Sequence, residues 1–92
     1  MYYILFYETN DNYIKNREPY RKEHLLLAQE ALDKGTLVMG GALSDPSDKA
    51  VLIFKSDNSL IVEEFVKNDP YVKNGLIKKW QVRKWNVVIS KE

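Results

Sequence analysis

The sequence contains no cysteine and only one histidine, three prolines and four glycines among its 92 residues. The absence of cysteine excludes a disulfide framework, a thiol nucleophile and a thiolate metal site. One histidine with scattered acidic residues is poor material for a metal centre, because such a centre needs several ligands at compatible spacing. The pair Gly40-Gly41 lacks the spacing and the following lysine of a phosphate-binding loop. We therefore expect neither a metal nor another cofactor.

Long hydrophobic runs are also missing. The apolar runs at residues 1–7 and 50–54 are far shorter than the roughly 20 residues needed to span a bilayer. No positively charged region precedes the first run, as it does in a secretion signal. We expect a cytoplasmic protein that does not bind a membrane.

The sequence has no strong excess of either charge, and its formal net charge is +1. Such a balance gives little attraction to nucleic acid or to an anionic membrane surface. A basic segment with two tryptophans, residues 73–85, could bind nucleic acid through charge and stacking. Lysines that protect the exposed side of a long strand explain the same segment more simply. We expect no nucleic acid as a partner.

The residues that are present are typical of a folded globular domain. Hydrophobic residues make up 45 % of the chain and aromatic residues 12 %, which argues against disorder. The length supports a single domain over residues 1–92. A chain this short buries only about 60–65 % of the surface that its unfolded form exposes, which favours oligomer formation.

Hydrophobic periodicity and turn residues predict six elements. They are strands at 2–7, 36–43, 50–55 and 76–89, and helices at 20–34 and 60–67. Pro19 suits the first turn of the first helix and Gly35 its end. The expected apolar stripe of that helix is Leu25, Ala28, Ala31 and Leu32. The order of the elements is the ferredoxin-like βαββαβ pattern, an α+β fold with a four-stranded antiparallel sheet.

Three local features refine this prediction. Residues 8–16 are polar and rich in Asn and Asp, and we expect a loop there. Gly40 and Gly41 indicate a bulge or a close backbone approach in the second strand. The apolar positions of the last strand change from even to odd numbers, which predicts a bulge near Arg83-Lys84.

The composition of the strands predicts a homodimer. Two helices can cover only one face of a four-stranded sheet. Residues 2–7, 37–39 and 50–54 are nevertheless apolar at both parities, as in a sheet that is buried on both sides. The uncovered face needs a partner, most economically a second copy related by a two-fold axis. We expect two copies to pack sheet to sheet.

His24 and Asp69 are the first candidates for chemistry. His24 is the only side chain of a type that ordinarily titrates near neutral pH, so it can act as a general base or acid. Asp69 could accept a hydrogen bond from His24 and fix its tautomer. The alternatives are a half-buried histidine without a task and an aspartate that caps a short helical turn before Pro70.

Basic and aromatic residues could complete such a site. Arg17 and Arg21 flank Pro19 and could hold an anionic substrate group, or they could simply lie in solvent at the start of the helix. Tyrosine hydroxyls could point into a pocket, although single aromatic residues are more often part of the core. The tyrosines in question are Tyr7, Tyr20 and Tyr71.

Taken together, these residues resemble the YciI-like protein family. The matching positions are Arg17, His24-Leu25, Gly35-Thr36-Leu37, Gly40-Gly41, Phe54, Phe65, Asp69-Pro70-Tyr71, Gly75-Leu76 and Trp85. The resemblance implies a ferredoxin-like fold of the dimeric α/β-barrel type and a site built around His24 and Asp69, with Arg17 beside them. An activity associated with part of this family is elimination of hydrogen chloride from chlorinated hydroxyaromatics. Family members commonly have Gly-Pro where this chain has Gly41-Ala42, so one wall of the pocket differs.

The leading hypothesis is a lyase-type or proton-transfer enzyme. In it, His24 takes a proton from a small polar or aromatic substrate, and Asp69 stabilises the imidazolium. Arg17 holds an anionic group and Tyr71 shapes the pocket. One alternative is a non-enzymatic domain that binds a small molecule or a partner in the same cleft. Another is a monooxygenase of the same barrel superfamily.

Overall fold

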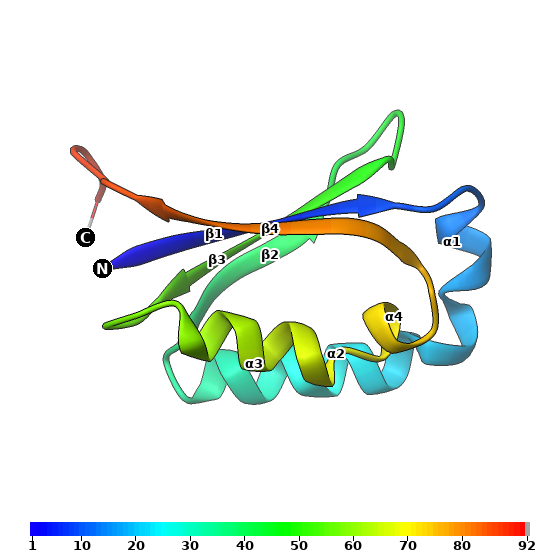
Figure 1. Cartoon of the computed structure of the whole chain (residues 1–92), viewed down its shortest axis with the longest axis horizontal. Coiled ribbons are helices and arrows are strands. Elements are labelled where there is room, and N and C mark those ends of the chain that lie inside the picture. The colour runs from blue at the N-terminus through cyan, green and yellow to red at the C-terminus, as the bar shows by residue number, and fades with distance from the viewer. Residues whose placement is uncertain (92) are drawn as a thin grey trace.

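Strands and helices alternate along the chain in the predicted order, and the computed structural model describes them over residues 1–91 (Figure 1). The strands are β1 (Tyr2–Thr9), β2 (Leu37–Ala42), β3 (Lys49–Lys55) and β4 (Ile77–Trp85). The helices are α1 (Tyr13–Asn16), α2 (Glu18–Asp33), α3 (Leu60–Asn68) and α4 (Pro70–Lys73). The strands form one antiparallel sheet in the order β2-β3-β1-β4. The prediction of a ferredoxin-like α+β fold is confirmed.

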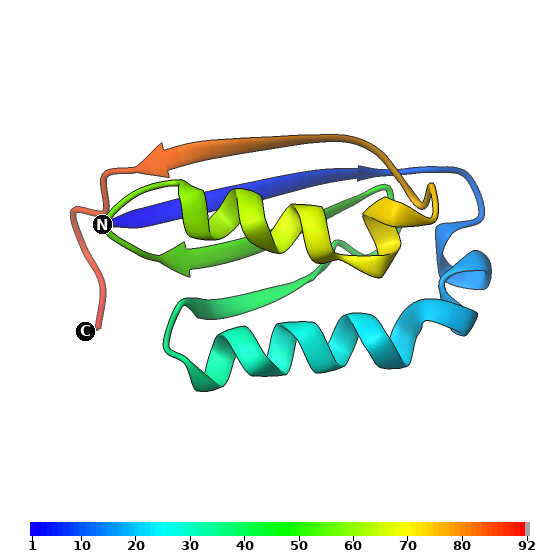
Figure 2. The same ribbon diagram turned by 60° about the horizontal axis from the view of Figure 1, so that its bottom comes forward.

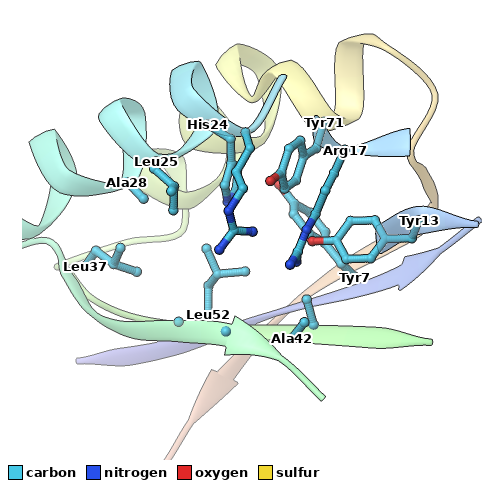
Figure 3. Close-up of a pocket in the computed structure, with 14 residues that line it drawn as sticks. Tyr7, Tyr13, Arg17, His24, Leu25, Ala28, Leu37, Ala42, Leu52 and Tyr71 are labelled. Carbon is cyan, nitrogen blue, oxygen red and sulfur yellow. The ribbon is translucent and has the colours of Figure 1, made fainter. Parts of the chain in front are cut away.

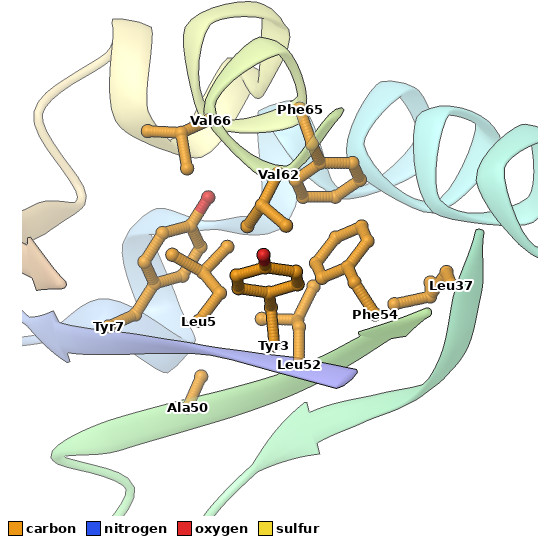
Figure 4. Close-up of a cluster of buried hydrophobic side chains, with 10 residues drawn as sticks. All are labelled: Tyr3, Leu5, Tyr7, Leu37, Ala50, Leu52, Phe54, Val62, Phe65 and Val66. Carbon is orange, nitrogen blue, oxygen red and sulfur yellow. The ribbon is translucent and has the colours of Figure 1, made fainter. Parts of the chain in front are cut away.

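Helices α2 and α3 cover one face of the sheet and leave the other face uncovered (Figures 1 and 2). Alternate residues of β1 point to the helices, as the two-residue period of a strand requires, and Tyr3, Leu5 and Tyr7 are buried. The register places Phe54 of β3 beside Tyr3 on the same face. Side chains of α3 close the core from above, as Figure 4 shows for Val62.

The ends of α2 follow from local chemistry. The helix begins at Glu18, two residues before the predicted start, with Pro19 in its first turn where a missing N–H costs nothing. It ends where Gly35 adopts a left-handed φ of 81°. The N–H of Gly35 bonds to the Leu32 carbonyl, and the N–H of Thr36 bonds to the Ala31 carbonyl at 3.0 Å. This pair of bonds satisfies carbonyls that the end of the helix would otherwise leave unpaired.

The apolar stripe of α2 differs from the prediction. Leu27, Ala28 and Ala31 pack against the core, whereas Leu25 and Leu32 are 47 % and 44 % exposed. The helix therefore lies on the sheet through small side chains. Leu25 is exposed because it lines a cavity between α2 and the sheet.

The last strand also differs. β4 ends at Trp85 rather than at residue 89, and its pairing with β1 runs without interruption past Arg83 and Lys84, so the bulge predicted there is wrong. Trp80 and Trp85 lie on opposite faces of the sheet, which explains why the apolar positions of this strand change from even to odd numbers. Val88 lies beyond the strand and is almost fully exposed.

The sheet has two irregularities elsewhere. One lies in β4, where Lys78 is an extra residue opposite Glu8 and Thr9 of β1, and the other lies in β2, where Val38 is extra between Leu37 and Met39. The bulge that the sequence predicts at Gly40-Gly41 therefore lies earlier in β2, between Leu37 and Met39. The expected close approach is present, because a Cβ at Gly40 would lie 3.0 Å from Cγ of Leu52.

Two short helices interrupt segments that were predicted as a loop and as a break. α1 lies within the polar segment 8–16 and buries Tyr13. α4 follows α3 directly, because Asp69 takes an extended φ/ψ and Pro70 begins a new turn. Both short helices lie at the same end of the molecule, next to the start of α2 (Figure 2). This end of the sheet carries the candidate site.

Candidate functional site

Asp69 is a buried carboxylate with three hydrogen-bond donors. Its side chain is 0 % exposed. Oδ1 accepts the backbone N–H of Tyr71 at 3.0 Å and Nδ1 of His24 at 2.8 Å. Oδ2 accepts the hydroxyl of Tyr7 at 2.7 Å. These donors replace the water that the charged group loses on burial.

Asp69 both caps α4 and accepts a hydrogen bond from His24. It is therefore at once the helix-capping residue and the partner of His24 that the sequence suggested as alternatives. The turn between α3 and α4 presents the carboxylate, α2 contributes His24, and β1 contributes Tyr7. The partners lie 45 and 62 residues from Asp69 in the sequence. Packing of the helices on the sheet brings them together.

The His24 ring is held from two sides. Nδ1 faces Asp69, and the ring stacks on Tyr71 with centroids 3.8 Å apart and planes at 8°. Because a carboxylate oxygen accepts this hydrogen bond, the proton lies on Nδ1. Nε2 has no hydrogen bond from residues 1–91, and the side chain is 14 % exposed at the edge of a cavity (Figure 3). His24 therefore turns its second ring nitrogen, Nε2, toward the cavity.

Tyr7 is a donor to Asp69 at every ordinary pH. Burial raises the pKa of the Tyr7 hydroxyl far above its usual value of 10.0, and the charge and hydrogen bond of Asp69 raise it further. Ionisation would place a second negative charge beside Asp69 in a site without water. The hydroxyl therefore keeps its proton and its bond to Oδ2.

Tyr71 differs from Tyr7 because its hydroxyl makes no hydrogen bond with well-formed geometry among residues 1–91. The residue is 1 % exposed. Burial raises the pKa of this hydroxyl and the charge of Tyr13 adds to the rise, whereas the charges of Arg17 and Arg21 and a weak hydrogen bond from Arg21 lower it. Both guanidinium groups are thus close enough to influence the hydroxyl.

The cavity beside His24 has a volume of about 210 Å³. Arg17 lies along one wall, 5.3 Å from the centroid of the Tyr13 ring, and its Nε atom is buried without a hydrogen-bond partner in the described chain. Arg21, one turn further along α2, also lines the cavity. Neither arginine forms an ion pair with a carboxylate of residues 1–91. The cavity therefore has a cationic side.

The opposite wall consists of small and aliphatic residues. Gly40, Gly41 and Ala42 of β2 lie next to Leu37 and Leu52 in this wall. The absence of side chains at the two glycines keeps the cavity open over the strand. Ala42 occupies the position where proline is common in the resembling family.

The structure brings together all four residues that the sequence suggested as a site. His24, Arg17 and Tyr71 line the cavity, and Asp69 lies directly behind His24. Tyr20 instead packs against a second buried cluster with Tyr13 and Tyr71.

Sequence reasoning named Arg21 together with Arg17 as a possible anion-binding residue, and the structure places both arginines at the cavity. It missed one contact of the site. The bond from Tyr7 to Asp69 had no local signal, because the two residues lie in separate elements.

Two kinds of site are absent from the described residues. No group of three or more His, Cys, Asp and Glu side chains within residues 1–91 could hold a metal ion. In the same part of the chain, no helix is long and apolar enough to cross a membrane.

Comparison with known families identifies the family of this chain. The sequence profile of the YCII-related domain matches residues 1–86, nearly the whole chain. The chain belongs to the YCII-related family. The resemblance inferred from the residues is confirmed by this match. A comparison with curated proteins finds no significant match.

Solved structures share the YCII-related fold of this chain. The 5-chloro-2-hydroxyhydroquinone dehydrochlorinase of Burkholderia phenoliruptrix, in complex with 2,5-dihydroxybenzoquinone, matches with a TM-score of 0.78 at 21% identity over 94% of each chain. Protein Atu4242 from Agrobacterium tumefaciens matches with a TM-score of 0.56 at 17% identity, over 90% of this chain and 89% of that one. An antibiotic biosynthesis monooxygenase matches with a TM-score of 0.56 at 11% identity, over 97% and 100%. At these identities the likeness shows a common fold.

Proposed function

We propose that this YCII-related protein is a small enzyme in which His24 and Asp69 transfer a proton from a small polar or aromatic substrate. The observation that carries the proposal is the 2.8 Å hydrogen bond from His24 to a fully buried carboxylate at the edge of a cavity. A histidine oriented in this way by a carboxylate is a common general base.

Each residue has a defined part in this reaction. Nε2 of His24 takes the proton, and the charge of Asp69 stabilises the imidazolium that forms. Tyr71 keeps the ring in position by stacking and shapes the pocket. Arg17 holds an anionic group of the substrate with its unpartnered guanidinium nitrogen. Because Asp69 keeps three donors throughout, the base needs no rearrangement before it acts.

Elimination of hydrogen chloride from a chlorinated hydroxyaromatic is the specific reaction that we propose. The ring first tautomerises to a keto form, in which a hydroxyl proton has moved to the carbon that bears chlorine. His24 then removes the proton of a second hydroxyl group, the freed electron pair forms a C=O π bond, the ring double bond shifts, and the C–Cl bond breaks with its electrons on chloride. No oxidant or cofactor is needed for this balance. The similarity to a dehydrochlorinase with the same fold supports the choice of reaction.

Chloride release from 5-chloro-2-hydroxyhydroquinone tests this proposal. The wild-type protein should release chloride faster than the buffer does, and the His24→Asn variant should be slower by about 100-fold or more. Lys22→Gln is a matched control, because Lys22 is exposed on the same helix and should not affect the rate. An unchanged rate in His24→Asn would show that the pair is not catalytic.

A non-enzymatic binding domain is the second candidate. The observation that favours it is the cavity itself, whose unpartnered donors need a ligand whether or not the ligand reacts. Ligand-induced shifts of the His24 ring protons, without chloride release or exchange of a substrate proton for solvent deuterium, would favour this function.

We also propose that two copies pack through the uncovered face of the sheet. This face carries a set of apolar side chains, several of them exposed. They are Ile4, Phe6, Met39, Val51, Ile53 and Trp85. Because all the helices lie on the opposite side, nothing within residues 1–91 covers this apolar surface (Figure 1). A second copy covers it with the same surface, as two-fold symmetry requires.

A further inference from the structure

The charge of the cavity is distributed along α2. Arg17 precedes the helix and Arg21 lies one turn into it, followed by His24 on the next turn and by Ala28 one turn later. This spacing places the four residues on one face of the helix. In Figure 3 the Arg17 side chain lies at the Tyr13 and Tyr71 end of the cavity, and Ala28 and Leu37 lie at the other end. The cavity thus has a cationic end and an apolar end, with the base between them.

The cationic end contains hydrogen-bond donors that have no acceptor. The buried Nε of Arg17 lacks a partner in residues 1–91, and the buried hydroxyl of Tyr71, which faces the Arg21 guanidinium, has no acceptor there for its own proton. Buried donors are rarely left without an acceptor, because each loses its bonds to water on burial. The oxygens of Asp69, the nearest carboxylate, are already occupied by Tyr7, Tyr71 N–H and His24. An acceptor from outside the chain is therefore missing at this end.

The balance of charge limits what that acceptor can be. Apart from His24, two guanidinium groups and one carboxylate leave a single net positive charge at the cavity. A monoanion neutralises this charge when it binds. After His24 takes a proton from the bound molecule, the ligand and the site have changed charge by equal and opposite amounts, so the balance persists.

We propose that the cavity binds a small planar carboxylate, with the carboxylate at Arg17, Arg21 and Tyr71 and an apolar body that extends toward Ala28 and Leu37. A carboxylate matches the planar fork of a guanidinium and accepts from a hydroxyl at the same time. The volume of about 210 Å³ suits a single substituted ring. This inference rests on the proposed function for the role of His24 and narrows its substrate to a ring that also carries a carboxylate, a group that 5-chloro-2-hydroxyhydroquinone lacks.

Binding of benzoate, compared with its uncharged isostere benzamide, tests this inference without any turnover. Both ligands are titrated into isotopically labelled wild-type protein, and affinity is read from amide shifts of residues around the cavity. Benzoate should bind at least about ten-fold more tightly than benzamide, because only benzoate pairs with the two guanidinium groups. Equal affinities, or tighter binding of inorganic phosphate than of benzoate, would overturn the inference.

Variants identify the groups that hold the carboxylate. Arg21→Gln should weaken benzoate by about ten-fold or more and leave benzamide unchanged, whereas Lys22→Gln, on the neighbouring exposed position, should change neither. Tyr71→Phe should also weaken benzoate, although the stacked ring is kept. Unchanged benzoate affinity in Arg21→Gln would place the anion elsewhere.

The same titration separates this inference from the proposed reaction. His24→Asn removes the base but none of the three groups assigned to the carboxylate, and it should bind benzoate like the wild type. Benzoate binding with no His24-dependent turnover would leave the carboxylate site standing and reject the enzyme. His24-dependent turnover without a preference for benzoate over benzamide would reject the carboxylate site and leave the enzyme standing.

Discussion

At the scale of single residues, the Asp69 carboxylate links the fold to the candidate chemistry. One of its oxygens caps α4 and holds His24, and the other holds Tyr7. A buried charge is tolerated only with such partners, since its isolated transfer out of water costs far more than the whole stability of a small domain. The residues of the site therefore also stabilise this end of the molecule.

Asp69→Asn should lower the free energy of unfolding by about 2 kcal/mol, because it replaces charge-assisted hydrogen bonds with weaker neutral ones. Urea denaturation followed by circular dichroism measures this change. Asp48→Asn is a matched control, since the Asp48–Lys49 pair is 3.9 Å long and exposed, and its loss should be nearly neutral. Equal losses of unfolding free energy in Asp69→Asn and Asp48→Asn would show that the hydrogen bonds of Asp69 do not stabilise the fold.

Tyr7 predicts a specific loss of stability in alkali. Its pKa is raised on folding, so above pH of about 10 the unfolded chain releases this proton while the folded chain retains it. Stability should then fall with rising pH, with Tyr7 contributing about 1.4 kcal/mol per pH unit. The contribution is fully present below pH of about 10. Tyr7→Phe should show a shallower decline in alkaline urea denaturation, and parallel curves would contradict the prediction.

At the scale of elements, the helix ends are decided by a few neighbouring residues. Gly35 ends α2 because its φ of 81° lets two N–H groups turn back to the helix carbonyls. Gly75 performs the same task after α4, with a φ of 73°, and turns the chain toward β4. These positions require a conformation that other residues adopt only with strain.

Gly35→Ala should cost about 1 kcal/mol of unfolding free energy, since the strain of a positive φ is its only penalty. A Cβ at this position would meet no atom within 4 Å. Gly41→Ala provides the comparison, because its added Cβ is equally free and its φ is not positive, so its stability should change little. Thermal or urea denaturation of the two variants measures the difference.

At the scale of the whole molecule, the uncovered face of the sheet is the main feature that a single chain leaves unexplained. Its side chains are apolar on several neighbouring strands, and the pairing of the strands brings them together into one surface. In the proposed dimer, this surface is buried without disturbing the site, which lies on the helical side of the sheet (Figures 1 and 3).

Size-exclusion chromatography with light scattering should show a dimer at micromolar concentration. Phe6→Glu should convert the dimer to a folded monomer, because Phe6 is 39 % exposed on the uncovered face and a charge there cannot be buried against itself. Lys67→Glu changes a charge on the exposed side of α3 and should leave the dimer intact. A wild-type monomer would reject the homodimer.

The prediction of the fold from the sequence was most accurate where the decision is local. Pro19 and Gly35 bound α2 within two residues, because capping and turn conformations depend on adjacent backbone groups. Runs of aromatic and β-branched residues between turn residues were enough to recognise four strands. The bulge predicted near Arg83 and Lys84 was wrong, since the faces of β4 depend on its register with β1 and not on its own pattern.

For the site, the sequence by itself determined which groups are available, and the tertiary structure decided how they are used. The only histidine and an Asp-Pro pair could be singled out by residue type, whereas the bond from Tyr7 to Asp69 and the stacking of His24 on Tyr71 could not. Those contacts join β1, α2 and the α3–α4 turn. Such contacts form only when the apolar faces of separate elements pack together, because packing carries the polar groups at their edges into one place.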